Sequence, residues 1–288
     1  MLFLRLSAMK RILLYLAFMA LGFAASAQYY YKDVIGTKEV NALNKALKKA
    51  RVLSVNIKSY NFDDLEIEDF LCEQTLENNA KMVYTVTGSP YTGENRLYSW
   101  FNNASMITRS VDSNVSTTIQ NNYNYDASGN LTSLTITSFE NGSRDKMIET
   151  HSWTYNNNRP EKMVLTKTKS DTITVLFTAD EKGNIITEVA YRKGRVKETI
   201  YYYYDDQNRL TDIVKYSYIA GRLLPETVFE YNADGTISKR TDFTPGKSDY
   251  QNWLFKYDAN GLKTEERCYL KGNMFKGKLL YKYEVEKE

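Results

Sequence analysis

The chain has 288 residues with 38 basic and 35 acidic side chains, which gives a formal net charge of +3. Three of the basic residues, Arg5, Lys10 and Arg11, lie among the first 27 residues, which contain no acidic residue, so 35 residues of each sign remain. A nucleic-acid-binding protein needs a basic excess to displace counterions, and this balance excludes nucleic acid as a predicted partner.

The first 27 residues have the layout of a signal peptide. Lys10 and Arg11 precede an apolar run, Ile12 to Ala25, and Ala25-Ser26-Ala27 forms a small-residue cleavage site. We predict cleavage after Ala27. The apolar run is short for a membrane span, and no later segment of the sequence is a better candidate. We therefore expect no transmembrane segment after cleavage. The sequence therefore predicts an exported protein of the periplasm, cell surface or extracellular space.

Residues 28–90 read as a small α+β segment. Apolar residues spaced for one helix face predict a helix over about 37–50, and "VLSVNIKSY" (52–60) alternates as a strand does. The acidic stretch 62–79 fits a strand or a helix. We interpret the whole segment as a cover over one end of a sheet, where it would shield an edge strand.

The rest of the chain, residues 91–288, is a β-repeat domain. Pairs of aromatic residues at positions i and i+2 recur about every 26 residues, which is the spacing of side chains on one face of a strand. The second position falls at Tyr125, Tyr155, Ala179, Tyr204, Tyr231, Tyr257 and Tyr283, of which Ala179 breaks the aromatic pattern. We call these residues the anchors.

Each anchor is followed by a turn signal. An Asp or Asn comes next, as Asp126 and Asp205 do, and three residues later stands Gly129 or, in one unit, Asn208. Asp and Asn side chains start turns by accepting from the backbone, and Gly or Asn tolerates the positive φ that closes a bulged hairpin. A second turn occurs in the middle of each repeat, so one repeat is two antiparallel strands.

The segments "YNYDASGNL" (123–131), "YYYDDQNRL" (202–210) and "FEYNADGTI" (229–237) resemble the YD repeats of RHS-type bacterial surface proteins. The resemblance covers residues 95–288 and implies an extended, coiling antiparallel sheet in an exported or cell-surface protein. The unit at Tyr155 lacks the turn Gly, the unit at Ala179 lacks the Tyr, and the array is short. The toxin-enclosing role of long family members is therefore not carried over.

These observations predict a mainly β protein. We expect a long antiparallel meander of two-stranded repeats that forms a curled single sheet or an open barrel. A sheet of this many strands tends to curl, which predicts that most anchors form the core. Anchors left open would instead form a ladder of rings suited to sugars or to a partner protein.

The run Tyr201 to Tyr204 contains an unusual pair. Tyr202 and Tyr204 point to the anchor face, so Tyr201 and Tyr203 point to the opposite face, where other units carry polar or mixed residues. We predict Tyr201 and Tyr203 as contact residues for a glycan or an envelope protein. The alternative is that they pack beneath the N-terminal segment.

Cys72 and Cys268 are the only cysteines. Neither lies near the cleavage site, so we do not expect a lipoprotein. In an oxidising compartment they are candidates for a disulfide, and two buried unpaired thiols are the alternative.

The sequence predicts no cofactor, metal site or catalytic residue. His151 is the only histidine, which excludes a multi-histidine zinc site, and it occupies a strand column that favours a satisfied sheet residue. Nucleotide-binding loops and serine-hydrolase elbows are absent from the sequence. The Asp-rich turns lack the twelfth-position Glu of a calcium loop, so hairpin turns explain them.

We expect an exported binding or structural protein of the cell envelope rather than an enzyme. The alternative is a carbohydrate-processing enzyme or accessory protein, because two carboxylates suffice for glycoside hydrolysis. The acidic candidates are Asp63/Asp64, Glu66/Glu68/Asp69, Asp205/Asp206 and Glu265/Glu266.

Overall fold

A computed structural model describes residues 29–168 and 172–287. The predicted signal peptide, residues 1–27, lies outside the described residues.

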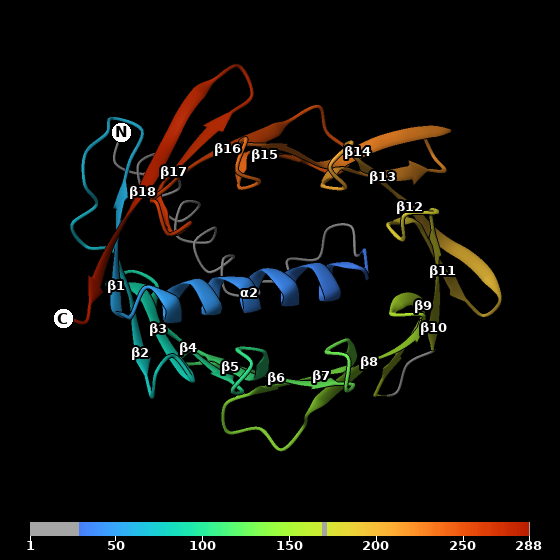
Figure 1. The fold of residues 1–288 in the computed structure, drawn as a ribbon, viewed down its shortest axis with the longest axis horizontal. Coiled ribbons are helices and arrows are strands. Elements are labelled where there is room, and N and C mark those ends of the chain that lie inside the picture. The colour runs from blue at the N-terminus through green and yellow to red at the C-terminus, as the bar shows by residue number, and fades with distance from the viewer. Residues whose placement is uncertain (1–28, 169–171, 288) are drawn as a thin grey trace.

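The described strands form one antiparallel sheet of 18 strands in which each strand pairs with the next along the chain. β1 (Val52–Tyr60) also pairs with β18 (Met274–Val285), and the sheet closes into a ring (Figure 1). The strands between them are β2 Leu71–Glu77, β3 Met82–Ser89, β4 Gly93–Phe101, β5 Ile107–Ser113, β6 Thr117–Tyr125, β7 Leu131–Glu140, β8 Met147–Asn156, β9 Arg159–Lys167, β10 Ile173–Ala179, β11 Ile185–Arg192, β12 Arg195–Tyr204, β13 Leu210–Ser217, β14 Arg222–Tyr231, β15 Ile237–Phe243, β16 Tyr250–Tyr257 and β17 Lys263–Leu270.

The expectation of a curled single sheet or an open barrel was wrong, because the barrel is closed. The closing ladder runs from Val52 opposite Val285 to Tyr60 opposite Lys278. Closure gives the first and last strands hydrogen-bonding partners and so removes both exposed edges. The mainly β class and the antiparallel meander are confirmed.

The predicted bulged turns are present in the repeats. In the first, both Ser128 N–H and Asn130 N–H donate to Asp126 Oδ1 at 2.9 Å, and the strand register shifts at Tyr125. Gly129 has a φ of +83°, and Asn208 takes the same left-handed conformation with a φ of 61°. These turn carboxylates serve as acceptors for their own backbone, as the hairpin interpretation requires.

The anchor tyrosines connect neighbouring repeats by hydrogen bonds. Each hydroxyl donates to the carbonyl oxygen of the residue that opens the return strand of an earlier repeat, as Tyr204 does to Ile185 at 3.0 Å. The same bond occurs from Tyr125 to Ile107, Tyr155 to Leu131, Tyr231 to Leu210, Tyr257 to Ile237 and Tyr283 to Lys263. An anchor therefore packs its ring inside the barrel and ties two hairpins together.

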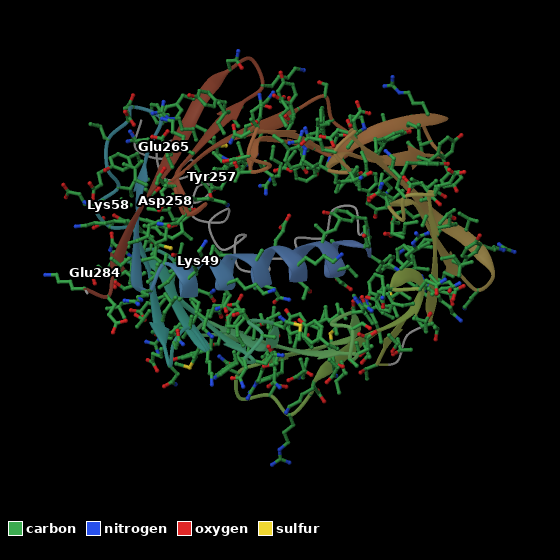
Figure 2. All side chains as sticks on the ribbon, viewed as in Figure 1. Lys49, Lys58, Tyr257, Asp258, Glu265 and Glu284 are labelled. Atoms are coloured by element: carbon green, nitrogen blue, oxygen red, sulfur yellow. The ribbon has the colours of Figure 1, made fainter. Side chains whose placement is uncertain are left out.

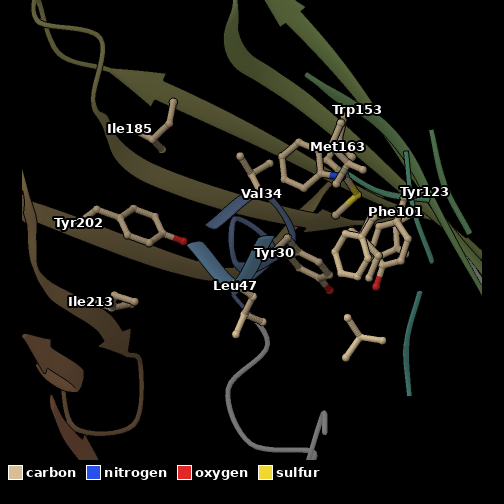
Figure 3. Close-up of a cluster of buried hydrophobic side chains, with 14 of the residues drawn as sticks. Tyr30, Val34, Leu47, Phe101, Tyr123, Trp153, Met163, Ile185, Tyr202 and Ile213 are labelled. Carbon is tan, nitrogen blue, oxygen red and sulfur yellow. The ribbon is translucent and has the colours of Figure 1, made fainter. Parts of the chain in front are cut away.

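The helix α2 (Lys32–Lys49) lies inside the ring, along the wall formed by β5 to β8 (Figure 1). Its buried side chains include Val34 and Leu47, which join the main buried cluster with Trp153 and Tyr202 (Figure 3). The helix was predicted over 37–50 and begins five residues earlier. No side chain caps it locally. Its N-terminal end is bound by a glutamate of the barrel wall, which has no local sequence signature.

We had expected the N-terminal segment to cover one end of the sheet, and this expectation was wrong. β1, β2 and β3 are part of the barrel wall, and the ambiguous stretch 62–79 contains β2. The division into domains near residue 90 stays a prediction.

Candidate functional site

The ring of strands encloses the helix α2 (Figure 1). A barrel of about eight strands is just filled by side chains, whereas barrels of about 16 to 18 strands leave a channel. Among the described residues, only the segment leading into and forming α2 lies within the ring (Figure 1). A single helix is about 10–12 Å across with its side chains, so it covers only part of the inner wall.

One half of the inner wall is covered by α2 and by Tyr29 to Tyr31, which lead into it. Inward side chains on β8 to β12 are almost fully buried: His151, Trp153, Met163, Leu165, Val175, Phe177, Glu188, Ile200 and Tyr202. This half forms the protein's main core.

The other half of the inner wall is partly exposed. On β14 to β16, the inward residues Phe229, Arg240, Asp242, Gln251 and Trp253 are only half-buried. We call these five residues the lumenal patch. Figure 2 shows the described side chains of both walls and the helix.

The helix carries a matching exposed face. Leu43, an apolar side chain, is 47% exposed although it lies inside the ring. The other exposed residues on this helix are Lys38, Glu39, Ala42, Lys45 and Lys49. Partly exposed side chains therefore occur both on the helix and on the wall formed by β14 to β16.

The lumenal patch combines rings with a charged pair. Arg240 Nε donates to Asp242 Oδ2 at 3.0 Å, with the two side chains 40% and 38% exposed. The guanidinium carbon of Arg240 lies 5.9 Å from the Trp253 ring centroid. Thr227 Oγ1 donates to Asp242 Oδ1 at 3.4 Å. The patch thus offers donors, acceptors and an aromatic surface side by side.

The strand register arranges the patch in two rows. Phe229, Arg240 and Trp253 lie opposite one another on β14, β15 and β16. Asp242 lies opposite Gln251, two residues away along both strands, so this row points to the same face as the first row. Side chains in one row of a sheet point to the same face, so all five converge on the lumen.

Glu39 on the helix interacts electrostatically with the opposite wall. Desolvation raises its pKa, and the positive charges of Arg240 and Lys263 lower it by a smaller amount.

Glu188 holds the N-terminal end of the helix. Tyr30 N–H donates to Glu188 Oε1 at 2.7 Å, Tyr31 N–H donates to Oε2 at 2.9 Å, and Tyr202 O–H donates to Oε2 at 2.7 Å. A carboxylate at this end accepts from unpaired backbone N–H groups and complements the helix dipole. Burial raises the pKa of Glu188 to about 7, and the three hydrogen bonds oppose this shift.

His151 forms a second contact with the same end of the helix. Its Nδ1 lies 2.5 Å from Asp33 Oδ2 and its Nε2 lies 2.7 Å from Glu149 Oε1. Burial lowers the pKa of His151, but the hydrogen bonds with Asp33 and Glu149 raise it to about 9. Both ring nitrogens have partners, so the prediction of a satisfied sheet residue is confirmed.

The predicted alternation of the tyrosine run is confirmed. Tyr202 is buried inside at 2% exposure, whereas Tyr203 is 45% exposed on the outer face. Tyr201 lies on the same outer face and is half-buried between Thr187 and Val214. Their role in contact stays a prediction.

Cys72 and Cys268 are buried free thiols. Cys72 belongs to β2 and Cys268 to β17, and both β1 and β18 lie between these strands. Three strand spacings amount to about 14 Å. A disulfide requires Cα atoms within about 7 Å, so pairing would distort the barrel.

The predicted acidic candidates do not combine into one recess. Glu265 points outward to Lys256 and Arg267, whereas Glu266 is buried and accepts from the Tyr281 hydroxyl. Asp205 binds its own turn and Arg209. In the loop after β1, Asp64 pairs with Lys278, and Glu66 pairs with Lys58.

The sequence analysis missed the lumenal patch. Its signal was the pair Arg240 and Asp242, which alternate with outward residues and so place charges on the otherwise apolar anchor face. This signal can be interpreted only when the register of β15 is known, because a register shift at Tyr231 changes which residues of β15 face inward.

Comparisons with known proteins give distant matches. A family model described as "Uncharacterised protein" matches residues 142–249. No curated protein matches the chain. Among solved structures, a porin-like protein from Bacteroides uniformis ATCC 8492 is 9% identical with a TM-score of 0.41, over 81% of this chain and 98% of that chain.

Two matches are to toxin complexes. The Photorhabdus luminescens Tc holotoxin pore (mutation TccC3-D651A) is 12% identical with a TM-score of 0.34, over 72% of this chain and 11% of that chain. The TcdB2-TccC3-Cdc42 structure is 9% identical with a TM-score of 0.30, over 73% of this chain and 16% of that chain.

Within residues 29–168 and 172–287, no helix has the length and apolar character needed to cross a membrane.

Proposed function

We propose that this chain is an exported binding protein that holds a small ligand in the lumen of its barrel, between α2 and strands β14 to β16. The observation that carries the proposal is the difference between the two halves of the inner wall. Trp153 on the helix-covered half is 4% exposed, whereas Trp253 on the other half is only half-buried.

The sequence supports the exported location. A signal peptide ending at Ala27 would leave Gln28 as the first residue, and the proposal concerns that mature chain. The resemblance to YD repeats points the same way, since it implies an exported or cell-surface protein. The cell envelope is therefore the compartment in which we expect the ligand.

The outer wall supports a role in water. On β6 the polar residues Thr118, Gln120, Asn122 and Asn124 alternate with inward residues. Ion pairs lie on the same outer surface, including Lys239 with Glu230 at 2.7 Å. The outer wall also carries exposed apolar residues such as Leu176 and Leu254, so polar residues predominate on β6 and not on every strand.

The enzyme alternative has less support. A glycosidase presents two carboxyl groups to one substrate at about 5–9.5 Å from each other. Of the acidic clusters singled out in the sequence, Glu265 and Glu266 point to opposite faces and Asp205 is held within its turn. Binding without chemistry is the simpler function for this lumen.

A thermal-shift screen tests the proposal. The mature protein would be incubated with amino acids, nucleosides, mono- and oligosaccharides and short peptides at millimolar concentration. A ligand that binds only the folded state raises Tm. We expect at least one class to do so for wild type and for Lys239→Ala, and to fail for Arg240→Ala. Lys239 precedes Arg240 on β15 but points outward, so it is the matched control. A screen with no Arg240-dependent stabilisation would overturn the proposal.

A second candidate function uses the outer face. Tyr203 is 45% exposed, and Tyr218 on the hairpin after β13 is 60% exposed. Tyrosine is more frequent in protein–protein interfaces than on the rest of the protein surface. The test is the double variant Tyr201→Ser, Tyr203→Ser, compared with wild type in glycan and envelope-protein binding. Lost binding at unchanged Tm supports a contact surface, and lost stability without a binding change contradicts it.

A further inference from the structure

We infer that the ligand of the lumenal patch is an uncharged oligosaccharide. This inference rests on the proposed function, since it assigns a chemical class to the ligand of the same lumen. It is carried by three features of the patch: an accessible indole, an ion pair that is neutral as a whole, and a second ring two strands away.

Trp253 supplies the surface for a sugar ring. Its indole is half-buried and points into the lumen, unlike Trp153, which is 4% exposed and stacked on Phe177. An aromatic face carries a negative quadrupole and attracts positively polarised hydrogens. The C–H face of a pyranose ring is flat and apolar enough to pack against such a surface.

The ion pair beside Trp253 supplies partners for hydroxyl groups. Arg240 offers only donors and Asp242 only acceptors, so together they can bind both functions of a hydroxyl. Both side chains are more than a third exposed, which leaves part of each available to a ligand. Gln251, in the same row as Asp242, adds an amide NH2 group that can donate, while its Oε1 already accepts from Lys276 Nζ at 3.4 Å and from Cys268 Sγ at 3.7 Å.

The charge balance argues against an ionic ligand. Arg240 is already compensated by Asp242 at 3.0 Å. Lys276, whose Nζ donates to Gln251 Oε1 at 3.4 Å, adds a positive charge, and Glu39 of the helix adds a negative charge. On the neighbouring strand, Lys263 pairs with Glu266 at 2.9 Å. An anion would meet these carboxylates and a cation would meet Arg240, whereas a neutral polyol meets neither repulsion.

The spacing of rings indicates more than one sugar unit. Phe229 and Trp253 lie on β14 and β16 and face the same side in one row. Second-neighbour strands are about 10 Å apart, so a ligand that contacts both rings spans this distance across Arg240. A single pyranose is too short for both contacts, and a short chain is not.

Binding would be measured by calorimetry on the full mature protein with two sets of probes. The uncharged set contains malto-, cello- and chito-oligosaccharides, and the acidic set contains oligogalacturonates of similar length. We expect a member of the uncharged set to bind wild type and Lys239→Ala alike. Trp253→Ala and Arg240→Ala should each weaken that binding by about tenfold or more. Trp253→Phe keeps an aromatic ring and should retain part of the affinity. This variant keeps the test valid if Trp253→Ala folds poorly.

The outcomes separate this inference from the proposed function. Arg240-dependent binding confined to oligogalacturonates, amino acids or nucleosides would overturn the saccharide inference and leave lumenal binding standing. Absence of any Arg240-dependent binding would overturn both. Saccharide binding that Trp253→Ala and Arg240→Ala leave unchanged, with both variants folded, would place the sugar elsewhere and also overturn the inference.

Discussion

The hydroxyl group of Tyr257 donates a hydrogen bond of 3.0 Å to the carbonyl oxygen of Ile237, twenty residues earlier in the chain. The same pairing recurs at the other five anchor tyrosines. The anchor tyrosine of each repeat therefore links that repeat to an earlier one by a hydrogen bond. An aromatic ring faces inward, and its hydroxyl satisfies a backbone acceptor where the bulged turn interrupts the ladder.

Removing this bond tests the structural role of the anchors. Tyr257→Phe deletes the hydroxyl and leaves the ring, so we expect a loss of about 0.5–1.5 kcal/mol in the free energy of unfolding. Tyr257→Ser also removes the ring and should cost about 2–4 kcal/mol. Urea denaturation measures both values. Equal stability of Tyr257→Ser and wild type would mean that the anchor column does not form core.

Tyr202 and Tyr203 form a matched pair for the two faces of the wall. Tyr202 is 2% exposed and donates to the buried Glu188, whereas Tyr203 is 45% exposed. We expect Tyr202→Phe to destabilise the protein by about 1–3 kcal/mol, because a buried acceptor loses a donor. Tyr203→Phe should change stability by less than about 0.5 kcal/mol. The reverse order in thermal melts would contradict the assigned alternation.

His151 predicts a loss of stability at alkaline pH. Its pKa in the folded protein is about 9, against 6.5 ordinarily. A raised pKa means that the folded state holds the proton more tightly. The stabilisation is therefore complete below pH 6.5 and is lost as the pH rises through 9. The slope attributable to one such group cannot exceed about 1.4 kcal/mol per pH unit.

The variant His151→Gln checks this prediction. Denaturation curves at pH 7, 8 and 9 should show a shallower decline of stability than for wild type, because the titrating group is gone. Glu188, with a pKa of about 7, contributes mainly between pH 4.5 and 7 and so leaves this window largely to His151. An unchanged slope in the variant would show that His151 does not carry the effect.

The cysteines predict resistance to thiol reagents. Burial raises the pKa of Cys72 to about 12 and that of Cys268 to about 11, so neither forms a reactive thiolate near neutral pH. Ellman's reagent should label both thiols only after unfolding, and reductant should leave Tm unchanged. Two fewer reactive thiols in the unfolded, unreduced protein would reveal a disulfide.

Local features of the fold could be predicted from the sequence. The spacing of Tyr202 and Tyr204 fixed their shared face, and Asp126 with Gly129 marked a bulged turn. Both depend on interactions within a few residues, such as an Asp side chain and the backbone that follows it.

Barrel closure and the position of the helix could not be predicted from the sequence. β1 and β18 are more than 200 residues apart, and their alternation is the same in an open sheet and in a closed barrel. Glu188 binds the helix end across 158 residues of sequence. The lumenal patch depends on closure, because Arg240 and Trp253 face a lumen only when the first and last strands pair.

Collisional quenching of Trp253 fluorescence by acrylamide is the most direct test of a hydrated lumen. Trp100→Phe with Trp153→Phe leaves Trp253 alone, and Trp100→Phe with Trp253→Phe leaves the helix-covered Trp153 as the reference. We predict that Trp253 is quenched several-fold more efficiently than Trp153. Equally weak quenching of both in folded proteins would show that small solutes do not reach this wall and would contradict lumenal binding.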